Sequence, residues 1–119
     1  MPHERRLFGD SGEALAVAYF LARGFAVVMR NWSCPLGEID LVIEKEGTTH
    51  FVEVKTRRSL EFGYPEESIT PTKLRKLART IEMYLNYAQH PPKSYQADAL
   101  AITILPNTEP EYHYVEHIL

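Results

Sequence analysis

Cysteine is almost absent from this sequence, because Cys34 is the only residue of its type in the 119-residue chain. A single cysteine excludes an internal disulfide bond and any zinc site built from several cysteines, and it fits a reducing compartment. Long apolar runs are lacking as well, since the longest, residues 14–22, is too short to cross a lipid bilayer. We therefore expect a cytoplasmic protein that does not insert into a membrane.

An excess of positive charge is also lacking. Thirteen lysines and arginines against sixteen acidic residues give a net charge of −3, which argues against binding nucleic acid over the whole surface. The basic residues are unevenly distributed, however, and a local stripe indicates a nucleic-acid partner better than the total charge does. The stripe consists of Lys55, Arg57, Arg58, Lys73, Arg75, Lys76 and Arg79. Basic residues on an exposed helix face are usually only solvated, so the stripe alone leaves both interpretations open.

The apolar residues that are present predict one α/β domain over residues 1–119. The hydrophobic fraction of 45%, with five Phe, seven Tyr and one Trp, is enough for a single core. Asp10 as N-cap and Gly24 as C-cap delimit a first helix, while Thr70 and Pro71 start a second. Strands are expected at residues 25–29, 37–43, 51–57, 97–105 and 112–119, with a loop over residues 59–69. The predicted order is α-β-β-β-α-β-β, with a mixed central sheet flanked by helices.

The second and third predicted strands form a β-hairpin whose turn is centred between Glu46 and Gly47. Side chains alternate along a strand, so one face of the hairpin is apolar and belongs to the core. The residues of this face are Ile39, Leu41, Ile43, Val52 and Val54. On the other face, the register sets Val42 opposite Phe51 and gathers four charged residues at one end. These are Glu38 opposite Lys55 and Asp40 opposite Glu53.

The facing pair of Asp40 and Glu53 is unusual, because like charges directly opposite each other destabilise a sheet. Two carboxylates about 4 Å apart repel by roughly 4 kcal/mol at an effective dielectric constant of 20. A divalent cation between them turns the repulsion into coordination, and Mg²⁺ prefers such oxygen ligands. The structural alternatives are a register shifted by one residue and a surface ion pair between Lys55 and Glu38. Strand chemistry alone does not decide between them.

Asp40 on one strand and Glu53-x-Lys55 on the next resemble the PD-(D/E)xK signature of restriction-endonuclease-like nucleases. A longer pattern is more specific, and it resembles the YraN-like family of small bacterial proteins within that superfamily. It consists of Gly12-Glu13, Ala14, Ala18, Tyr19, Leu21, Gly24-Phe25, Asn31, residues 37–41 and 51–57, Phe62-Gly63-Tyr64-Pro65, Lys73 and Asp98. The family is similar in layout to archaeal Holliday-junction resolvases. One departure is Gln96, where relatives commonly have Arg, and it weakens a substrate-binding role for Asp98.

The resemblance implies a restriction-endonuclease-like fold and a metal-dependent endonuclease that hydrolyses phosphodiester bonds in structured or branched DNA. It implies catalysis by Asp40, Glu53 and Lys55 with Mg²⁺ or Mn²⁺, and a homodimer. The implied metal ligands are Asp40, Glu53, the backbone carbonyl of Val54, and Glu13, which also fits a capping box. The nucleic-acid contacts predicted for this function are Arg57, Arg58, Lys73, Lys76 and Arg30.

Two other functions fit the same sequence. A domain that keeps the nuclease fold can bind nucleic acid as an adaptor without cutting it, because fold and motif do not guarantee turnover. RNA in place of DNA is the second alternative, as in RNA-processing nucleases of similar architecture. DNA is the expected partner of the two nucleic acids, given the resemblance to junction resolvases.

Overall fold

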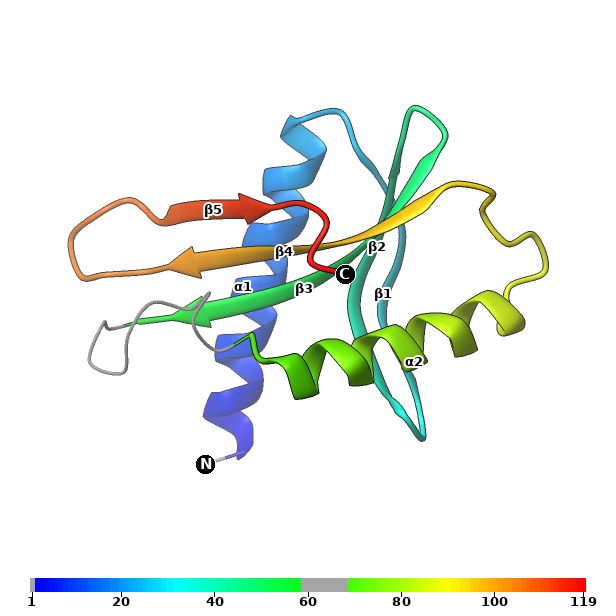
Figure 1. Ribbon diagram of the computed structural model, residues 1–119. Helices are drawn as coiled ribbons and strands as arrows, with labels where there is room; N and C mark the ends of the chain where they lie inside the picture. Colours follow the sequence, from blue (N-terminus) through cyan, green and yellow to red (C-terminus); the bar gives the residue numbers. More distant parts are fainter. Residues whose placement is uncertain (1, 59–68) are drawn as a thin grey trace.

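The structure, a computed structural model, describes the backbone of residues 2–58 and 69–119 and the side chains of residues 12–58 and 69–119. Figure 1 shows a twisted sheet with one helix on each side. The elements are α1 (Pro2–Ala22), β1 (Ala26–Cys34), β2 (Gly37–Lys45), β3 (Thr48–Arg57), α2 (Pro71–Tyr87), β4 (Tyr95–Thr103) and β5 (Glu111–Val115). Most of the predicted loop over residues 59–69, with Phe62 and Tyr64, lies outside the described residues.

The five strands form one mixed sheet in the order β1-β2-β3-β4-β5. β3 and β4 are parallel and are connected through α2, while the other neighbours are antiparallel. α1 covers one face, where Phe20 and Leu100 belong to the buried cluster, and α2 covers the other, where Leu77 and Phe51 do. The predicted element order and the restriction-endonuclease-like arrangement are confirmed. Within the described residues, neither helix combines the length and apolar character that a membrane span requires.

α1 ends as predicted but begins earlier. Gly24 has a φ of +87°, and the Phe25 amide donates to the Phe20 carbonyl at 3.1 Å, which is the pattern of a Schellman cap. The prediction that Asp10 caps the N-terminus is wrong, because the helix begins at Pro2 and Asp10 lies inside it. Proline is tolerated at a first helical position, since the N–H that it lacks would have no partner there.

α2 begins where the sequence predicts. Thr70 is the N-cap, its Oγ1 accepts a hydrogen bond from the Lys73 amide at 3.3 Å, and Pro71 is the first helical residue. The buried stripe of the helix contains Leu77, Thr80, Ile81 and Tyr84. The helix therefore packs on the sheet along one side and leaves its basic residues in solvent.

β1 is longer and more exposed than predicted. The expected strand ended at Met29, whereas the observed strand continues through Arg30, Asn31 and Trp32 to Cys34. The reason is its position at the sheet edge, where it follows β2 antiparallel across a two-residue turn at residues 35–36. An antiparallel edge strand can expose alternate side chains to water, so it needs no continuous apolar run.

The β2–β3 hairpin has the predicted register as far as the pair Leu41–Val52. The predicted pairs Asp40–Glu53 and Glu38–Lys55 do not form, because β2 leaves β3 beyond that point and continues beside β1. Its turn residues Glu46 and Gly47 have φ values of 51° and 83°, and two positive values are what a two-residue turn of type I′ requires. Val42 pairs with Phe51, which excludes a register shifted by one residue.

One face assignment in this hairpin is wrong. Ile39 lies with Val42 in the cluster beneath α2, whereas Leu41 lies in the cluster beneath α1. Strict alternation would separate Ile39 from Val42, so the alternation is interrupted between them. At the same point, the pairing of β1 with β2 omits Asp40 and Asn31. The φ of Asn31 is 52°, which is outside the extended conformation of a regular strand.

Candidate active site

β2 and β3 separate at Asp40. Their ladder ends at the pair Leu41–Val52, and beyond it β2 continues beside β1 while β3 continues beside β4. Figure 1 shows β2 turning away from β3 where it passes α2. The backbone N–H of Val54 donates to Asp40 Oδ2 at 2.8 Å, so a side chain from β2 bonds β3 at this point. The separated strands and the first half of α2 enclose a pocket of about 360 Å³.

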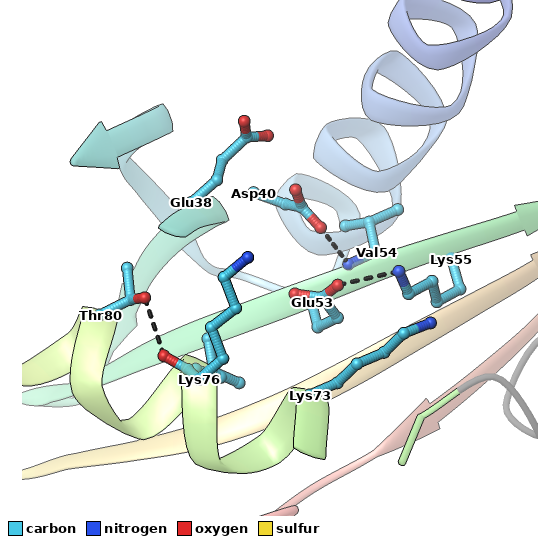
Figure 2. A pocket seen from close by; sticks show the side chains of 9 residues that line it. Glu38, Asp40, Glu53, Val54, Lys55, Lys73, Lys76 and Thr80 are labelled. Carbon is cyan, nitrogen blue, oxygen red and sulfur yellow. Dashed lines mark hydrogen bonds and ion pairs between the residues drawn. The ribbon is translucent and has the colours of Figure 1, made fainter. Parts of the chain in front are cut away.

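The pocket brings together the residues that the sequence predicts for catalysis. It is lined by Glu38, Asp40, Glu53, Val54, Lys55, Lys73, Lys76, Leu77 and Thr80. Figure 2 shows Asp40 reaching toward β3 beside Glu53, with Lys76 extending from α2 toward these acidic groups and Lys73 running alongside β3. Among the predicted metal ligands, Asp40, Glu53 and Val54 therefore share one pocket.

Asp40 is the electrostatically unfavourable group of the pocket. Burial and the negative charges of Glu53 and Glu38 raise its pKa from 3.8 to about 7, although the hydrogen bond from Val54 and the charge of Lys55 act in the opposite direction. A carboxyl group in such surroundings holds a proton near neutral pH, or it binds another cation in place of the proton.

Glu53 and Lys55 form an ion pair. Lys55 Nζ lies 3.1 Å from Glu53 Oε1, and both side chains are partly exposed. The two residues are two positions apart on β3 and so point to the same side of the sheet. Lys55 thus neutralises Glu53. The alternative considered from the sequence was an ion pair between Lys55 and Glu38.

α2 provides a cationic wall for the pocket. Lys73 and Lys76 are one turn apart and both line it. Gly37 lets β2 approach this part of the helix, because a Cβ added at Gly37 would lie 2.6 Å from Thr80 Oγ1 and 3.3 Å from Lys76 Cε. The close contact of Gly37 with α2 therefore fixes the separation between the lysines and the acidic end of the hairpin.

Four predicted site residues do not line the pocket: Glu13, Arg30, Arg57 and Arg58. Glu13 Oε2 accepts a hydrogen bond from Asn31 Nδ2 at 2.8 Å and lies 3.6 Å from Arg30 Nη2. These contacts connect α1 to β1, so the metal-binding role of Glu13 stays a prediction. Arg57 and Arg58 lie at and just beyond the end of β3, and their contact with nucleic acid stays a prediction as well.

A buried polar cluster on the α1 side of the sheet was not predicted from the sequence. Asp98 has no exposed surface, and its two oxygens accept four hydrogen bonds. The donors are His50 Nδ1, Tyr114 Oη, Gln96 Nε2 and the backbone N–H of His117. Burial alone would raise the pKa of Asp98, but these hydrogen bonds outweigh it and lower the pKa. The available signal was a lone carboxylate in an otherwise apolar strand, which requires buried donors.

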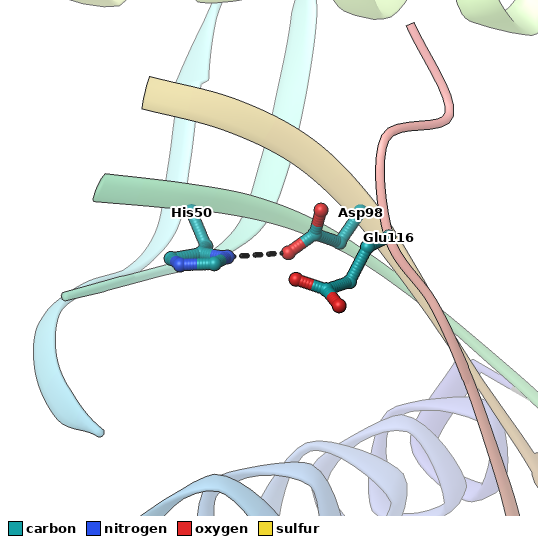
Figure 3. Close-up of side chains that lie close together, drawn as sticks. All are labelled: His50, Asp98 and Glu116. Carbon is teal, nitrogen blue, oxygen red and sulfur yellow. Dashed lines mark hydrogen bonds and ion pairs between the residues drawn. The ribbon is translucent and has the colours of Figure 1, made fainter. Parts of the chain in front are cut away.

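Glu116 completes this cluster at its exposed edge. Figure 3 shows His50, Asp98 and Glu116 close together, and one ligand-type atom from each lies within 4.8 Å of the others. Gln96 Nε2 bridges Asp98 Oδ1 and Glu116 Oε1 at 2.8 and 3.1 Å. Because four donors already saturate the Asp98 carboxylate, the geometry is that of a structural hydrogen-bond network.

The sequence pattern described as "Uncharacterised protein family UPF0102", the family called YraN-like above, matches residues 12–102. A UPF0102 protein of Caldicellulosiruptor saccharolyticus is 42% identical over 98 residues, which cover 82% of this chain and 83% of that protein. One from Nocardia farcinica is 34% identical over 115 residues, 97% and 91% of the two chains. One from Neisseria meningitidis is 46% identical over 77 residues, 65% and 67% of the two chains.

Proposed function

The chain belongs to the UPF0102 family, and from this premise and the carboxylate pocket we propose that it is a metal-dependent nuclease of the cytoplasm. The proposed reaction is hydrolysis of phosphodiester bonds, with Asp40, Glu53 and Lys55 as catalytic residues. The resemblance to junction resolvases extends the proposal to structured or branched DNA and to a homodimer. The observation that carries the proposal is the meeting of two carboxylates and a lysine where β2 separates from β3.

The donor set of the pocket suits Mg²⁺ or Mn²⁺. Asp40 and Glu53 offer carboxylate oxygens and Val54 offers a carbonyl oxygen, and hard divalent cations prefer oxygen ligands. The raised pKa of Asp40 supports this fit, because a bound cation offsets the burial and the charge of Glu53 that cause it. When bound, such an ion lowers the pKa of a coordinated water and balances charge on the phosphate.

The lysines have separate roles in this proposal. Lys55, 3.1 Å from Glu53, orients the attacking water or stabilises charge that develops on the phosphate. Lys73 and Lys76 on the opposite wall bind phosphates next to the cut. Contacts to phosphates follow the shape of the backbone and carry no base sequence, which fits a nuclease that selects DNA structure.

Cleavage of labelled substrates tests the proposal. The panel consists of duplex, single-stranded, flapped and four-way-junction DNA, with single-stranded RNA, each in Mg²⁺, Mn²⁺ or EDTA. We expect metal-dependent cutting of a branched DNA and a fall of at least about 100-fold in Lys55→Ala and in Asp40→Ala. Cutting that persists in both variants would exclude this pocket from the reaction, and preferred cutting of RNA would change the substrate.

One contact favours a second function, that of a non-catalytic adaptor. Lys55 already pairs with Glu53, so part of the negative charge that a metal ion would balance is balanced by the protein itself. Such a domain would bind DNA through its lysines without turnover. Tight, salt-sensitive binding to the same substrates, with no cutting in either metal, would favour the adaptor.

Replacing Lys73 and Lys76 together with glutamine is expected to reduce the salt dependence of DNA binding. Each phosphate contact contributes about 0.7–0.9 to the slope of log K against log salt, so losing two contacts lowers the slope by about 1.4–1.8. Binding titrations over a range of KCl concentrations, without divalent metal, measure this slope. Lys93→Gln, an exposed lysine between α2 and β4, is the control and should keep the wild-type slope. A wild-type slope in the double variant would contradict the assignment.

A further inference from the structure

The second half of α2 carries an exposed aromatic surface beside the cationic wall. Tyr87 is 65% exposed, yet its ring centre lies 5.7 Å from that of Trp32 and 6.4 Å from that of Tyr84. Trp32 in turn meets Tyr84 edge to face at 5.3 Å. Tyr87 is thus supported by rings from β1 and α2 while much of its surface faces solvent. Trp32, Tyr84 and Tyr87 are defined here as the aromatic platform.

The platform and the pocket lysines lie along one side of α2. Lys73, Lys76, Met83 and Tyr87 follow one another at intervals of three, seven and four residues, and all four are exposed. These intervals are those of neighbours on a helix surface, so the four side chains form a row. At a rise of about 1.5 Å per residue, Lys76 and Tyr87 are about 16 Å apart along the axis, a distance that a few nucleotides of one strand span.

We propose that the aromatic platform stacks a base in a single-stranded arm of the substrate, a few nucleotides from the phosphate bound by Lys76. This inference rests on the proposed nuclease function, because it names the substrate class of the same pocket. A paired base has both faces covered by its neighbours, whereas an unpaired base offers a face that an aromatic ring can cover. The substrate is therefore a DNA with an unpaired segment beside the cut, such as a flap or a tailed duplex.

Charge favours a nucleic acid over a protein as the partner of this row. Residues 71–81 of α2 include four basic side chains and no acidic one. The row is thus cationic at one end and aromatic at the other. A single strand has the complementary chemistry, because its backbone is anionic and its bases stack on aromatic rings.

Trp32 is the only tryptophan of the chain, so tryptophan fluorescence reports directly on the platform. The experiment titrates the full chain in EDTA, so that no cutting occurs, with a blunt duplex and with the same duplex bearing a single-stranded tail of about ten nucleotides, within the range of about 4–16 nucleotides that single-strand-binding sites cover. We expect the Trp32 emission to change with the tailed duplex and to stay constant with the blunt one.

Variants at exposed tyrosines make the test specific. Tyr87→Ala should weaken binding of the tailed duplex by about 5-fold to 100-fold and leave binding of the blunt duplex unchanged. Tyr87→Phe keeps the ring and should keep the affinity. Tyr95→Ala removes a tyrosine that is 51% exposed at the start of β4, away from the row, and should bind like the wild type.

The outcomes separate this inference from the nuclease proposal. The inference would be overturned, even if the protein is an active nuclease, by either of two results. One is a wild-type affinity of Tyr87→Ala for the tailed duplex, and the other is a Trp32 emission that is the same with the tailed and the blunt duplex. Tail binding with the expected losses, but without cutting in Mg²⁺, would keep the inference and overturn the nuclease proposal. A Trp32 emission that depends on protein concentration, with a dimer lost in Tyr87→Ala, would assign the platform to a second copy and overturn the inference.

Discussion

Replacing Asp40 with asparagine is expected to stabilise the metal-free protein by about 2–4 kcal/mol at pH 8. The cause is the pKa of Asp40, which burial and the charges of Glu53 and Glu38 raise from 3.8 to about 7. The upper limit of the range, about 4 kcal/mol, converts the change in pKa at about 1.36 kcal/mol per unit. The lower limit, about 2 kcal/mol, allows for the partial exposure of the pocket to solvent. Asparagine keeps an oxygen to accept the Val54 N–H and removes the charge.

The pH dependence of this gain follows from the direction of the pKa shift. Unfolded Asp40 loses its proton near pH 3.8, whereas folded Asp40 keeps it up to about pH 7. Unfolding therefore releases a proton within this window, and the stability of the wild type falls relative to the variant as the pH rises. Below the window the two proteins should be equally stable, and above it the difference should reach its full value. Urea unfolding at a series of pH values measures the difference.

Added Mg²⁺ is expected to reverse the ranking of the two proteins. An ion that binds only the folded wild type adds about 4.1 kcal/mol at a thousand times its Kd, which exceeds the advantage of Asp40→Asn, and the variant loses this gain. Glu44→Gln is the matched control, because Glu44 is exposed on the same strand and should behave like the wild type throughout. An asparagine variant that is no more stable than the wild type above pH 7 would contradict the electrostatic account of the pocket.

The hairpin that carries this pocket was predictable because residues close together in the sequence determine its turn and its register. Glu46 and Gly47 allow a two-residue turn, and once the turn is fixed every pair along the strands is fixed with it. Val42 opposite Phe51 followed directly, but the count fails beyond Leu41–Val52, where β2 leaves β3 and Asp40 bonds the Val54 N–H instead of pairing with Glu53. The start of α2 was predictable for the same reason, since capping depends on neighbouring residues.

The features that the sequence analysis missed depend on distant parts of the chain. His50 and Asp98 are 48 residues apart and meet only because β3 and β4 pair in parallel across α2. No turn fixes the register of such a crossover, so no partner of Asp98 could be identified from the sequence. Ile39 was assigned to the wrong face because the alternation of β2 is interrupted beside β1, and that pairing could not be read from β2 alone. The predicted cap at Asp10 failed because α1 extends back to Pro2.

Replacing Asp98 with alanine is expected to lower the free energy of unfolding by about 3–5 kcal/mol, because it leaves a buried network without its common acceptor. His50, Tyr114, Gln96 and the backbone of His117 all donate to this carboxylate. Since whole domains are stable by only about 5–15 kcal/mol, the variant should be close to unfolding at moderate temperature. Tyr114→Phe removes a single donor and should cost about 1.5–3 kcal/mol.

The free energy of unfolding measured at low pH provides an independent test of this network. The matched control is Glu116→Gln, at the exposed edge of the network. The pKa of Asp98 lies below 3.8 in the folded protein, so its stabilisation is complete above that pH and is lost as the pH falls through the folded value. The gap between the wild type and Asp98→Ala should therefore narrow only below pH 3.8, opposite in sign to the effect at Asp40. Glu116→Gln should stay within about 0.5 kcal/mol of the wild type, because Glu116 is exposed. Equal losses in the two variants would show that surface charge, and not the buried network, stabilises this side of the sheet.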